Sequence, residues 1–438
     1  MEKLYLGVSK KDITPKVGSR LAGYRSDIYS SSVHDNLDVT AFSFMQGDRC
    51  AIMISATIVT LETDHADEIR ARISKECNVP KENILIACTH THSGPTTFGV
   101  LAFGERDEEY CENILVPRMI EAAKEATESR VPVTMGYETG KTYIGINRRE
   151  LTIDNYVELG QNPWAPYDPR MTVISFKNSD GACVANMIHF GMHGTAAGSN
   201  REISQDFAGV MVRRMEILTG GVTAFFNGAQ GDVGPRLTNG TTAANWDEGD
   251  IKYAEEIGGI AAHDAMKIWK SIKRFTTPHL NAYTSTMTLP VKPRPSLDEA
   301  KLQYAECLAA PPETDSTRKV IAASRMAYYK NVIDSYEENY TEKEYDKQNE
   351  TFVSLGKLKF AGTPFEPFCE ISMRIQKERP EDEILLVACT NGRAGYLPTE
   401  SELNRGGYEV ISFRFSQIQP YADDTDWHFM KETLKNLE

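Results

Sequence analysis

Runs rich in branched aliphatic residues alternate with amphipathic runs along the first half of the chain, and this alternation limits the fold more than any other feature. Residues 40–44 and 51–55 flank Gln46-Gly47-Asp48, a pattern that predicts two strands joined by a tight turn. Residues 61–77 instead place apolar side chains four apart with charges on the opposite face, which is typical of a helix. The sequence therefore predicts an α/β fold with a mixed β-sheet core flanked by helices. Further strands are expected at residues 171–176, 183–189, 223–226, 356–361, 383–389 and 410–415, and further helices at residues 109–128, 206–220 and 251–272.

Residues 297–350 differ from the rest of the chain because they are charged, favourable to helix and rich in tyrosine. Pro311-Pro312 interrupts them, so we expect a helical insert that folds as a hairpin and covers the core or mediates a contact. Strand-like runs resume after the insert. Residues 1–438 are therefore predicted to form a single domain.

The charge and the hydropathy of the chain limit its partners. The 438 residues carry a formal net charge of −14, and such an acidic balance argues against nucleic acid or an anionic membrane as the main partner. The N-terminus has no apolar run of signal-peptide length, and no segment approaches the ~18–20 apolar residues of a membrane helix. We therefore expect a cytoplasmic protein with no integral membrane segment, acting on a small molecule. A homo-oligomer is compatible with the sequence.

The cysteines argue against a thiolate metal site. There are eight of them, and no two form a Cys-x-x-Cys pair. Several lie in apolar runs, so buried free thiols are expected rather than a disulfide framework.

His90 and His92 stand two residues apart in Cys-Thr-His-Thr-His-Ser-Gly-Pro, directly after the apolar run 83–87. Residues two apart on a strand point to the same face, so both imidazoles could act in one cleft. Two interpretations are open. The pair could be hydrogen-bonded core histidines, or it could form a zinc site in which one imidazole binds the metal and the other faces the substrate.

A second pair, His189 and His193, lies at the end of the strand expected at residues 183–189. Glycines at 191 and 194 disfavour a helix, so the two histidines are not expected to be joint metal ligands. His193 lies in the loop and is freer to reach a cleft, whereas His189 is expected to be buried structure.

Two further segments carry weaker signals. Asp232 lies in the glycine-rich run 227–236, which a tight turn explains as well as a bound ligand does. Tyr396 and Tyr408 lie in loops with glycine or proline, where tyrosine is usually packed at the surface. Neither segment indicates a metal site by its spacing alone.

Taken together, these segments resemble the catalytic domain of the neutral ceramidases. The matching blocks follow the family's order over nearly the whole chain, and Thr-His-Thr-His-Ser-Gly-Pro is the most specific of them. The blocks are residues 7–15, 89–95, 147–148, 193–195, 231–233 and 396–399.

The resemblance implies one zinc ion held by two histidines, a glutamate and a tyrosine. Matched motif by motif, the ligands are His90, His193, Glu366 and Tyr396. Glu366 lies in a degraded match to the family's Gly-Glu-Phe block, and Glu370 is the alternative to it.

The resemblance also implies a chemistry. Bound zinc lowers the pKa of a water molecule toward ~7, and that water attacks an amide carbonyl. Tyr408 and Arg148 would stabilise the developing oxyanion, and His92 would carry the proton to the leaving amine. Asp232 and Asp206 would orient the ligands from behind.

Three features depart from the family. Gly234 stands where the family has a serine that is important for ceramide cleavage, so its hydroxyl is missing. From the given ends of the sequence we also expect no secretory signal of the family's kind before residue 1 and no C-terminal immunoglobulin-like domain after Glu438. The zinc site is expected to survive these changes, whereas the lipid substrate need not.

The leading interpretation is a zinc-dependent, ceramidase-like amide hydrolase, which would place the chain in sphingolipid metabolism if the amide is a ceramide. Its substrate is either an N-acyl lipid or a smaller polar amide. The main alternative is a non-catalytic zinc-containing binding protein on the same fold, and a third is zinc hydrolysis of an ester or phosphoester. Intact His92 and Arg148 favour the enzyme, because a binding protein has less need of a proton shuttle.

Overall fold

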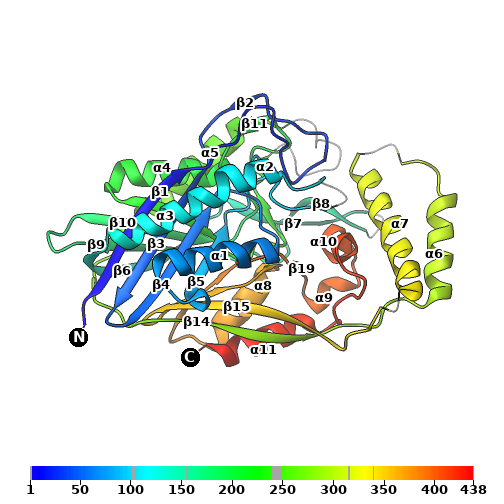
Figure 1. Ribbon diagram of the computed structural model, residues 1–438. Helices are drawn as coiled ribbons and strands as arrows, with labels where there is room; N and C mark the ends of the chain where they lie inside the picture. Colours follow the sequence, from blue (N-terminus) through cyan, green and yellow to red (C-terminus); the bar gives the residue numbers. More distant parts are fainter. Residues whose placement is uncertain are drawn as a thin grey trace.

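The computed structural model describes residues 2–100, 104–153, 156–238, 249–313, 316–338 and 340–437. Three groups of four strands enclose a shared apolar core (Figure 1). The first group is β1 (Leu4–Asp12), β3 (Asp38–Gln46), β4 (Arg49–Ala56) and β5 (Ile84–Cys88). The second group is β6 (Val131–Lys141), β9 (Arg170–Lys177), β10 (Cys183–Phe190) and β12 (Val222–Asn227). The third group is β14 (Leu280–Pro290), β15 (Tyr345–Leu355), β16 (Leu358–Gly362) and β18 (Glu383–Val387).

The first two groups belong to one eight-stranded sheet that is joined at a single point. β1 and β6 pair only over residues 4–6 and 131–133. Beyond that point the two halves face each other, and Phe42 of β3 meets Phe226 of β12 with ring centroids 6.1 Å apart. Residues along each strand alternate between the shared core and the outer helices, as the two-residue period of a strand requires.

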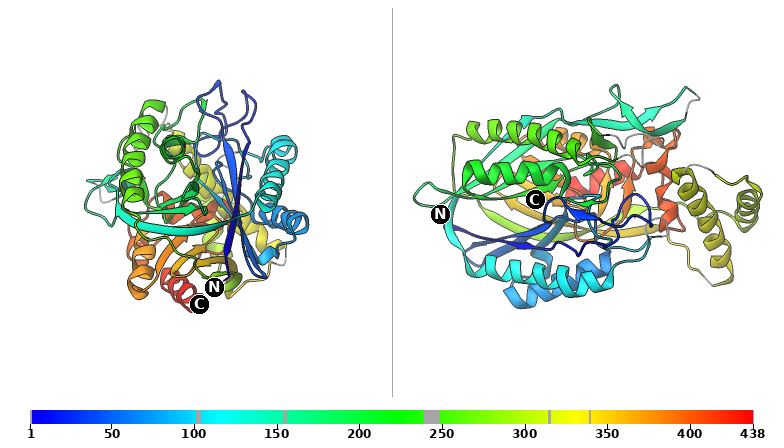
Figure 2. Two further views of the ribbon diagram at one scale, coloured as in Figure 1. Left: turned by 90° about the vertical axis from the view of Figure 1, so that its left-hand side faces the viewer. Right: turned by 90° about the horizontal axis from the view of Figure 1, so that it is seen from above.

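Each strand group is covered on its outer side by a pair of helices. The pairs are α1 (Thr63–Cys77) with α3 (Val116–Glu128), α4 (Asp206–Thr219) with α5 (Ile251–Ser271), and α8 (Cys369–Glu378) with α11 (Thr425–Asn436). The left view of Figure 2 shows the three pairs spaced around the strands. The predicted mixed α/β fold with a sheet core flanked by helices is therefore confirmed. Among the described residues, no helix combines the length and the apolar character needed to cross a membrane.

The ends of three core strands meet at one place. Asn227, the last residue of β12, donates hydrogen bonds of 3.0 Å to the carbonyl of Thr89 after β5 and to that of Met192 after β10. Short sheets lie at this same end of the strands, and they bring in segments that are distant in the sequence. They are β13 (Val233–Pro235) with β7 (Gly145–Leu151) and β8 (Val157–Asn162), and β17 (Phe365–Pro367) with β19 (Gly395–Leu397).

The expected helical insert forms a hairpin of α6 (Leu297–Ala309) and α7 (Ser316–Glu337), which projects from the right-hand side of the molecule in Figure 1. The helical part of the insert is shorter than expected, because residues 345–350 belong to β15. They pair there with residues 285–290 of β14. Exposed and half-buried side chains alternate over residues 345–349, whereas Met287 and Leu289 of β14 are buried, and this tertiary pairing overrides the helix-favouring composition.

The prediction of a strand at residues 410–415 is wrong. This segment forms α10 (Tyr408–Ile411) and a 3₁₀ turn, Ser412–Phe415. Phe413 packs on Tyr328 of α7, with ring centroids 5.4 Å apart, and the apolar side chains of residues 410–415 are half-buried. Short apolar runs of this kind do not distinguish strand from helix by periodicity.

Candidate metal centre

His90 and His193 are held so that the same nitrogen of each ring faces one point. His90 follows β5 in a left-handed backbone conformation, φ 69°, which is rare outside glycine and marks a constrained position. Its Nδ1 lies 2.8 Å from the carbonyl of Val59, and Nδ1 of His193 lies 2.7 Å from the carbonyl of Gln230. A carbonyl can only accept, so each Nδ1 is the donor and each Nε2 is the nitrogen that faces the site.

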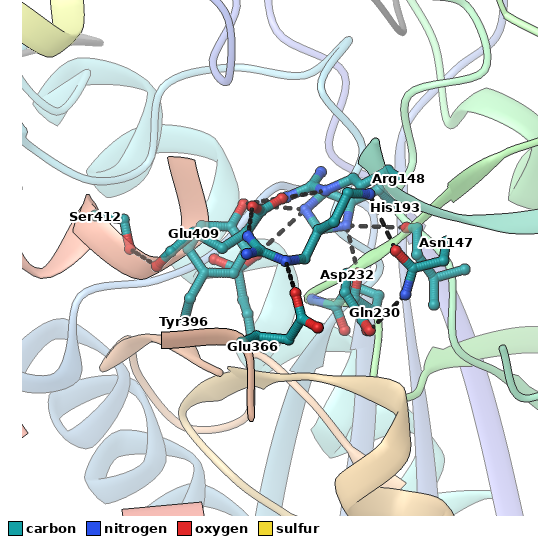
Figure 3. Close-up of polar contacts among 12 residues, drawn as sticks. Asn147, Arg148, His193, Gln230, Asp232, Glu366, Tyr396, Glu409 and Ser412 are labelled. Atoms are coloured by element: carbon teal, nitrogen blue, oxygen red, sulfur yellow. Dashed lines mark hydrogen bonds and ion pairs between the residues drawn. The ribbon is translucent and has the colours of Figure 1, made fainter. Parts of the chain in front are cut away.

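Glu366 and Tyr396 complete the cluster from a pair of parallel strands. They are direct partners in the register of β17 and β19. Oε2 of Glu366 lies 3.3 Å from Nε2 of both His90 and His193. The hydroxyl of Tyr396 lies 3.2 Å from Nε2 of His193, and Figure 3 shows these two residues together with Glu366. The alternative ligand, Glu370, instead pairs with Arg374 on α8 at 2.7 Å.

These four side chains fit a metal ion. Two imidazole nitrogens, a carboxylate oxygen and a phenol oxygen converge, and imidazole with carboxylate is a donor set typical of zinc. Oε2 of Glu366 is buried and accepts no hydrogen bond from a neutral donor among the described residues, so it needs a positive charge beside it, which a metal ion or a protonated His90 supplies. The predicted ligands are thus brought together, and their role as ligands stays a prediction.

Two other side chains lie within reach of the same point. His92 has a ring nitrogen within 4.8 Å of those of His90 and His193, and Cys389 lies equally close to His90 and Glu366. The Cys389 thiol also accepts from the side-chain amide of Gln230 at 3.4 Å. Sequence reasoning missed Cys389, because a lone cysteine at the end of an apolar run carries no signal of a site.

Burial and charge set the protonation of the metal-free cluster. Burial lowers the pKa of His193 to about 4, and the positive charge of Arg148 acts in the same direction. Burial also acts to lower the pKa of His90, but the Glu366 carboxylate raises it well above its usual range. Burial would raise the pKa of Glu366, yet the adjacent His90 holds it well below its usual range. Metal binding would therefore displace a proton from the pair of His90 and Glu366.

A network of buried charges holds Tyr396 from the other side. Arg148 donates to the Tyr396 hydroxyl at 3.0 Å and to Glu409 at 2.8 Å, and Arg149 donates to the second oxygen of Glu409 at 2.7 Å. Arg148 and Arg149 lie on β7, whereas Glu409 lies on α10, so the network ties two distant segments together (Figure 3). Sequence reasoning assigned no role to Arg149 or Glu409.

His92 and Tyr408 lie beside the cluster without joining it. Both ring nitrogens of His92 are buried without a hydrogen-bond partner among the described residues, and its ring lies 5.2 Å from that of Tyr24. Burial lowers the pKa of His92 well below its usual range, and the neighbouring histidines add to this effect. Burial also raises the pKa of Tyr408, whose ring lies 5.8 Å from that of Tyr396. Both side chains are therefore neutral in the metal-free protein.

Asp232 and Asp206 fix segments of the chain that border the site. Asp232 accepts from the backbone N–H of Cys369 at 2.7 Å and from the side chain of Asn147 at 2.9 Å, so both of its oxygens are occupied away from the histidines. Burial raises its pKa to about 6. Asp206 accepts from the N–H groups of residues 196 and 197, which fixes the loop after His193. As expected, His189 is structural and bonds to the carbonyl of Leu386 at 3.0 Å.

A small cavity lies over the cluster. Its volume is about 50 Å³, and His92, Arg148, Tyr396 and Tyr408 contribute to its wall. Gly234 also lines it, beside Arg148. A Cβ added at Gly234 would come no closer than 3.4 Å to the Arg148 side chain, so the missing serine leaves open space at this point.

The comparisons with known proteins give the family of this chain. Residues 4–255 match the family described as neutral/alkaline non-lysosomal ceramidase, N-terminal. The neutral ceramidase B of Dictyostelium discoideum is 26% identical over 56% of this chain and 37% of its own length. The neutral ceramidase of Mycobacterium tuberculosis is 26% identical over 53% of this chain and 40% of its own length. The matches thus span well under two thirds of these relatives.

The fold has a solved counterpart in the same family. The crystal structure of the neutral ceramidase from Pseudomonas aeruginosa superimposes with a TM-score of 0.74, covering 99% of this chain and 74% of that one at 18% identity. The family match covers more than half of the 438 residues. The chain therefore belongs to the neutral/alkaline non-lysosomal ceramidase family.

Proposed function

We propose that this chain is a zinc-dependent hydrolase of a C–N amide bond. One observation carries the proposal: His90, His193, Glu366 and Tyr396 converge beneath a cavity that His92 and Arg148 line. Membership in the ceramidase family supports a hydrolase of amides, since its relatives carry the name neutral ceramidase. The substrate is an N-acyl lipid such as ceramide, which would place the enzyme in sphingolipid metabolism, or a smaller polar amide.

His90, His193, Glu366 and Tyr396 would hold the zinc ion. When bound, the ion supplies a Lewis acid and lowers the pKa of water toward ~7. The carbonyls of Val59 and Gln230 fix the tautomers of the two histidines and keep both Nε2 atoms available as ligands.

The remaining residues orient the substrate and move the proton. His92 is neutral and has free ring nitrogens, so it can take a proton from the attacking water and give it to the leaving amine. The Arg148 guanidinium, fixed by Glu409, and the Tyr408 hydroxyl can donate to the oxygen on which negative charge develops. The walls of the small cavity limit the access of bulk water to these groups.

The alternatives differ from this proposal in turnover or in the bond that is cleaved. A non-catalytic zinc-binding protein would need the four ligands but not an unpartnered His92, whose buried ring nitrogens cost free energy without a function. A zinc esterase would use the same residues on a different bond. A cytoplasmic location remains part of the proposal, resting on the expectation from the sequence.

The test is the metal content of protein purified without chelator, followed by hydrolysis of amides. Wild type is expected to contain about one zinc per chain, as a single-metal site of this kind holds. His193→Ala is expected to lose both the zinc and the activity, because it removes a ligand and leaves the buried Glu366 uncompensated. His263→Ala is the matched control, since His263 is exposed on α5.

Two results would count against the proposal. A wild-type protein that takes up no zinc on titration would exclude the metal centre. A zinc-loaded protein that cleaves esters but no amide would favour the esterase.

A further inference from the structure

We propose that this site acts on a compact amide and excludes the long hydrocarbon chains of an N-acyl lipid. The inference rests on the proposed amide hydrolysis and narrows its substrate class. It is carried by the size of the cavity over the metal ligands and by the way its walls are fixed.

The cavity is too small for a lipid. It measures about 50 Å³, whereas sites that bury a drug-sized ligand occupy ~300–1,000 Å³. One water molecule needs roughly 10–15 Å³ on the same measure, so the space holds only a few non-hydrogen atoms. An amide group with its nearest substituents fits, and two alkyl chains do not.

The wall on one side lies directly on His92. A Cβ added at Gly23 would fall 2.2 Å from Nδ1 of His92, so the backbone of this segment is already in contact with the ring. Tyr24 continues the wall and packs edge-on against the same ring at 5.2 Å. The segment cannot move inward, and moving outward would expose His92.

A second part of the wall is anchored by buried charges. Arg148 and Tyr396 line the cavity and are joined by a hydrogen bond of 3.0 Å. Glu409 fixes Arg148 at 2.8 Å and is itself almost completely buried. Widening the cavity on this side would break a buried ion pair and leave a buried charge without its partner.

The polar groups of the cavity also suit a compact substrate. Within the described part of the chain the buried ring nitrogens of His92 have no hydrogen-bond partner, and the space beside Gly234 adjoins the Arg148 side chain. A polar substituent close to the amide can satisfy such groups, so we expect the substrate to carry one at this point.

Apolar side chains do lie exposed on the neighbouring strands, but they are outside the cavity. Leu151, Tyr156 and Trp164 are 49%, 46% and 93% exposed. The cavity wall is formed instead by Leu159 and Gly160 from this region. The exposed residues therefore add nothing to the space around the amide.

The test uses zinc-loaded protein and N-acyl derivatives of 2-amino-1,3-propanediol that carry acetyl, butyryl, octanoyl or palmitoyl groups. Amine release is measured with fluorescamine, and palmitoyl ceramide in mixed micelles is measured alongside. In a site that buries the acyl chain, each added methylene would raise kcat/KM about fourfold. We expect kcat/KM instead to stay level or to fall by about tenfold from butyryl to octanoyl. A rise with chain length, or preference for ceramide, would overturn the inference.

Leu159→Ala tests whether the wall sets this limit. Leu159 is half-buried in the wall, and its truncation is expected to raise the octanoyl-to-butyryl ratio of kcat/KM severalfold. Leu151→Ala, an exposed position on β7, is the matched control and should leave the ratio unchanged. An unchanged ratio in Leu159→Ala would contradict the assignment of this wall.

Binding separates the failure of this inference from that of the proposed function. If zinc-loaded protein hydrolyses no amide, the proposed function fails, and the size of the site is then read from calorimetric binding of acetate, butyrate and octanoate. Affinity that does not grow with chain length supports a compact site. Affinity that grows about tenfold from butyrate to octanoate refutes it.

Discussion

At the scale of single residues, three imidazoles lie together but differ in what their nitrogens do. Nδ1 of His90 and of His193 is occupied by a backbone carbonyl, which leaves one nitrogen on each ring for a metal. Neither nitrogen of His92 has a hydrogen-bond partner in the described part of the chain. This difference separates the two predicted ligands from the predicted proton carrier.

His92→Ala is therefore expected to retain zinc and to lose rate. The loss in kcat should be about 10²–10⁴-fold, the usual contribution of a general acid or base. Zinc content and kcat are measured on the same preparation, with His90→Ala as the comparison that should lose the metal. A fully active His92→Ala enzyme would show that another group carries the proton.

Residue types explain which site positions could be predicted. The His-x-His motif identified His90 and His92, because two imidazoles after a strand carry a distinct signal. The assignments of Glu366 and Tyr396 came only from the resemblance to the family. Cys389 and Glu409 lie in the site through tertiary contacts and have no sequence signal of their own.

At the scale of elements, the site depends on how short strands and helices are joined. Glu409 of α10 receives hydrogen bonds from Arg148 and Arg149 of β7, at 2.8 and 2.7 Å. All three side chains are at least nine-tenths buried. The position of α10, and with it Tyr408, therefore depends on one carboxylate.

Glu409→Gln is expected to destabilise the protein by about 3 kcal/mol, because two buried guanidinium groups lose their counter-charge. The free energy of unfolding is measured in urea, with the exposed Glu378→Gln on α8 as control. Zinc affinity should also fall, since Arg148 holds the Tyr396 hydroxyl. A variant as stable as the control would mean that the network contributes little to docking α10.

Element types were predicted well where the chain is locally consistent. Strands β9, β10 and β12 and helices α1, α4 and α5 follow their apolar periodicity, and the hairpin around Gly47 has the expected turn. The predictions failed at residues 345–350 and 410–415, where partners distant in the sequence decide the structure. Neither the pairing of β14 with β15 nor the packing of Phe413 on α7 can be predicted from a short stretch of sequence.

At the scale of the whole molecule, the site exists because the core brings distant segments together. His90, His193, Glu366 and Tyr396 are spread over about three hundred residues, yet each follows or lies on a strand at one end of the core. Asn227 bonds the segments after β5 and β10 to the end of β12. Local sequence patterns could predict that the chain is α/β, but not this meeting of strand ends.

The third strand group contains a carboxyl group that links the stability of the whole fold to pH. Glu350 of β15 is fully buried, and among the described residues its carboxyl group accepts one hydrogen bond, from the Thr433 hydroxyl of α11 at 2.8 Å. Burial raises the pKa of Glu350 from 4.5 to about 8. The folded protein therefore keeps a proton on Glu350 at pH values where the unfolded chain has lost it.

The direction of the effect follows from proton linkage. Between pH 4.5 and about 8 the native state binds one more proton than the unfolded state, so stability falls as the pH rises. A shift of this size corresponds to a loss of roughly 3–5 kcal/mol across that window.

Glu350→Gln cannot ionise and keeps an oxygen that can accept from Thr433. The variant is therefore expected to have a free energy of unfolding that changes less with pH and exceeds that of wild type at pH 8. Urea unfolding at pH 5, 6.5 and 8 measures this, with the exposed Glu344→Gln as control. Parallel pH profiles for wild type and Glu350→Gln would show that this carboxyl group does not link the stability of the fold to pH.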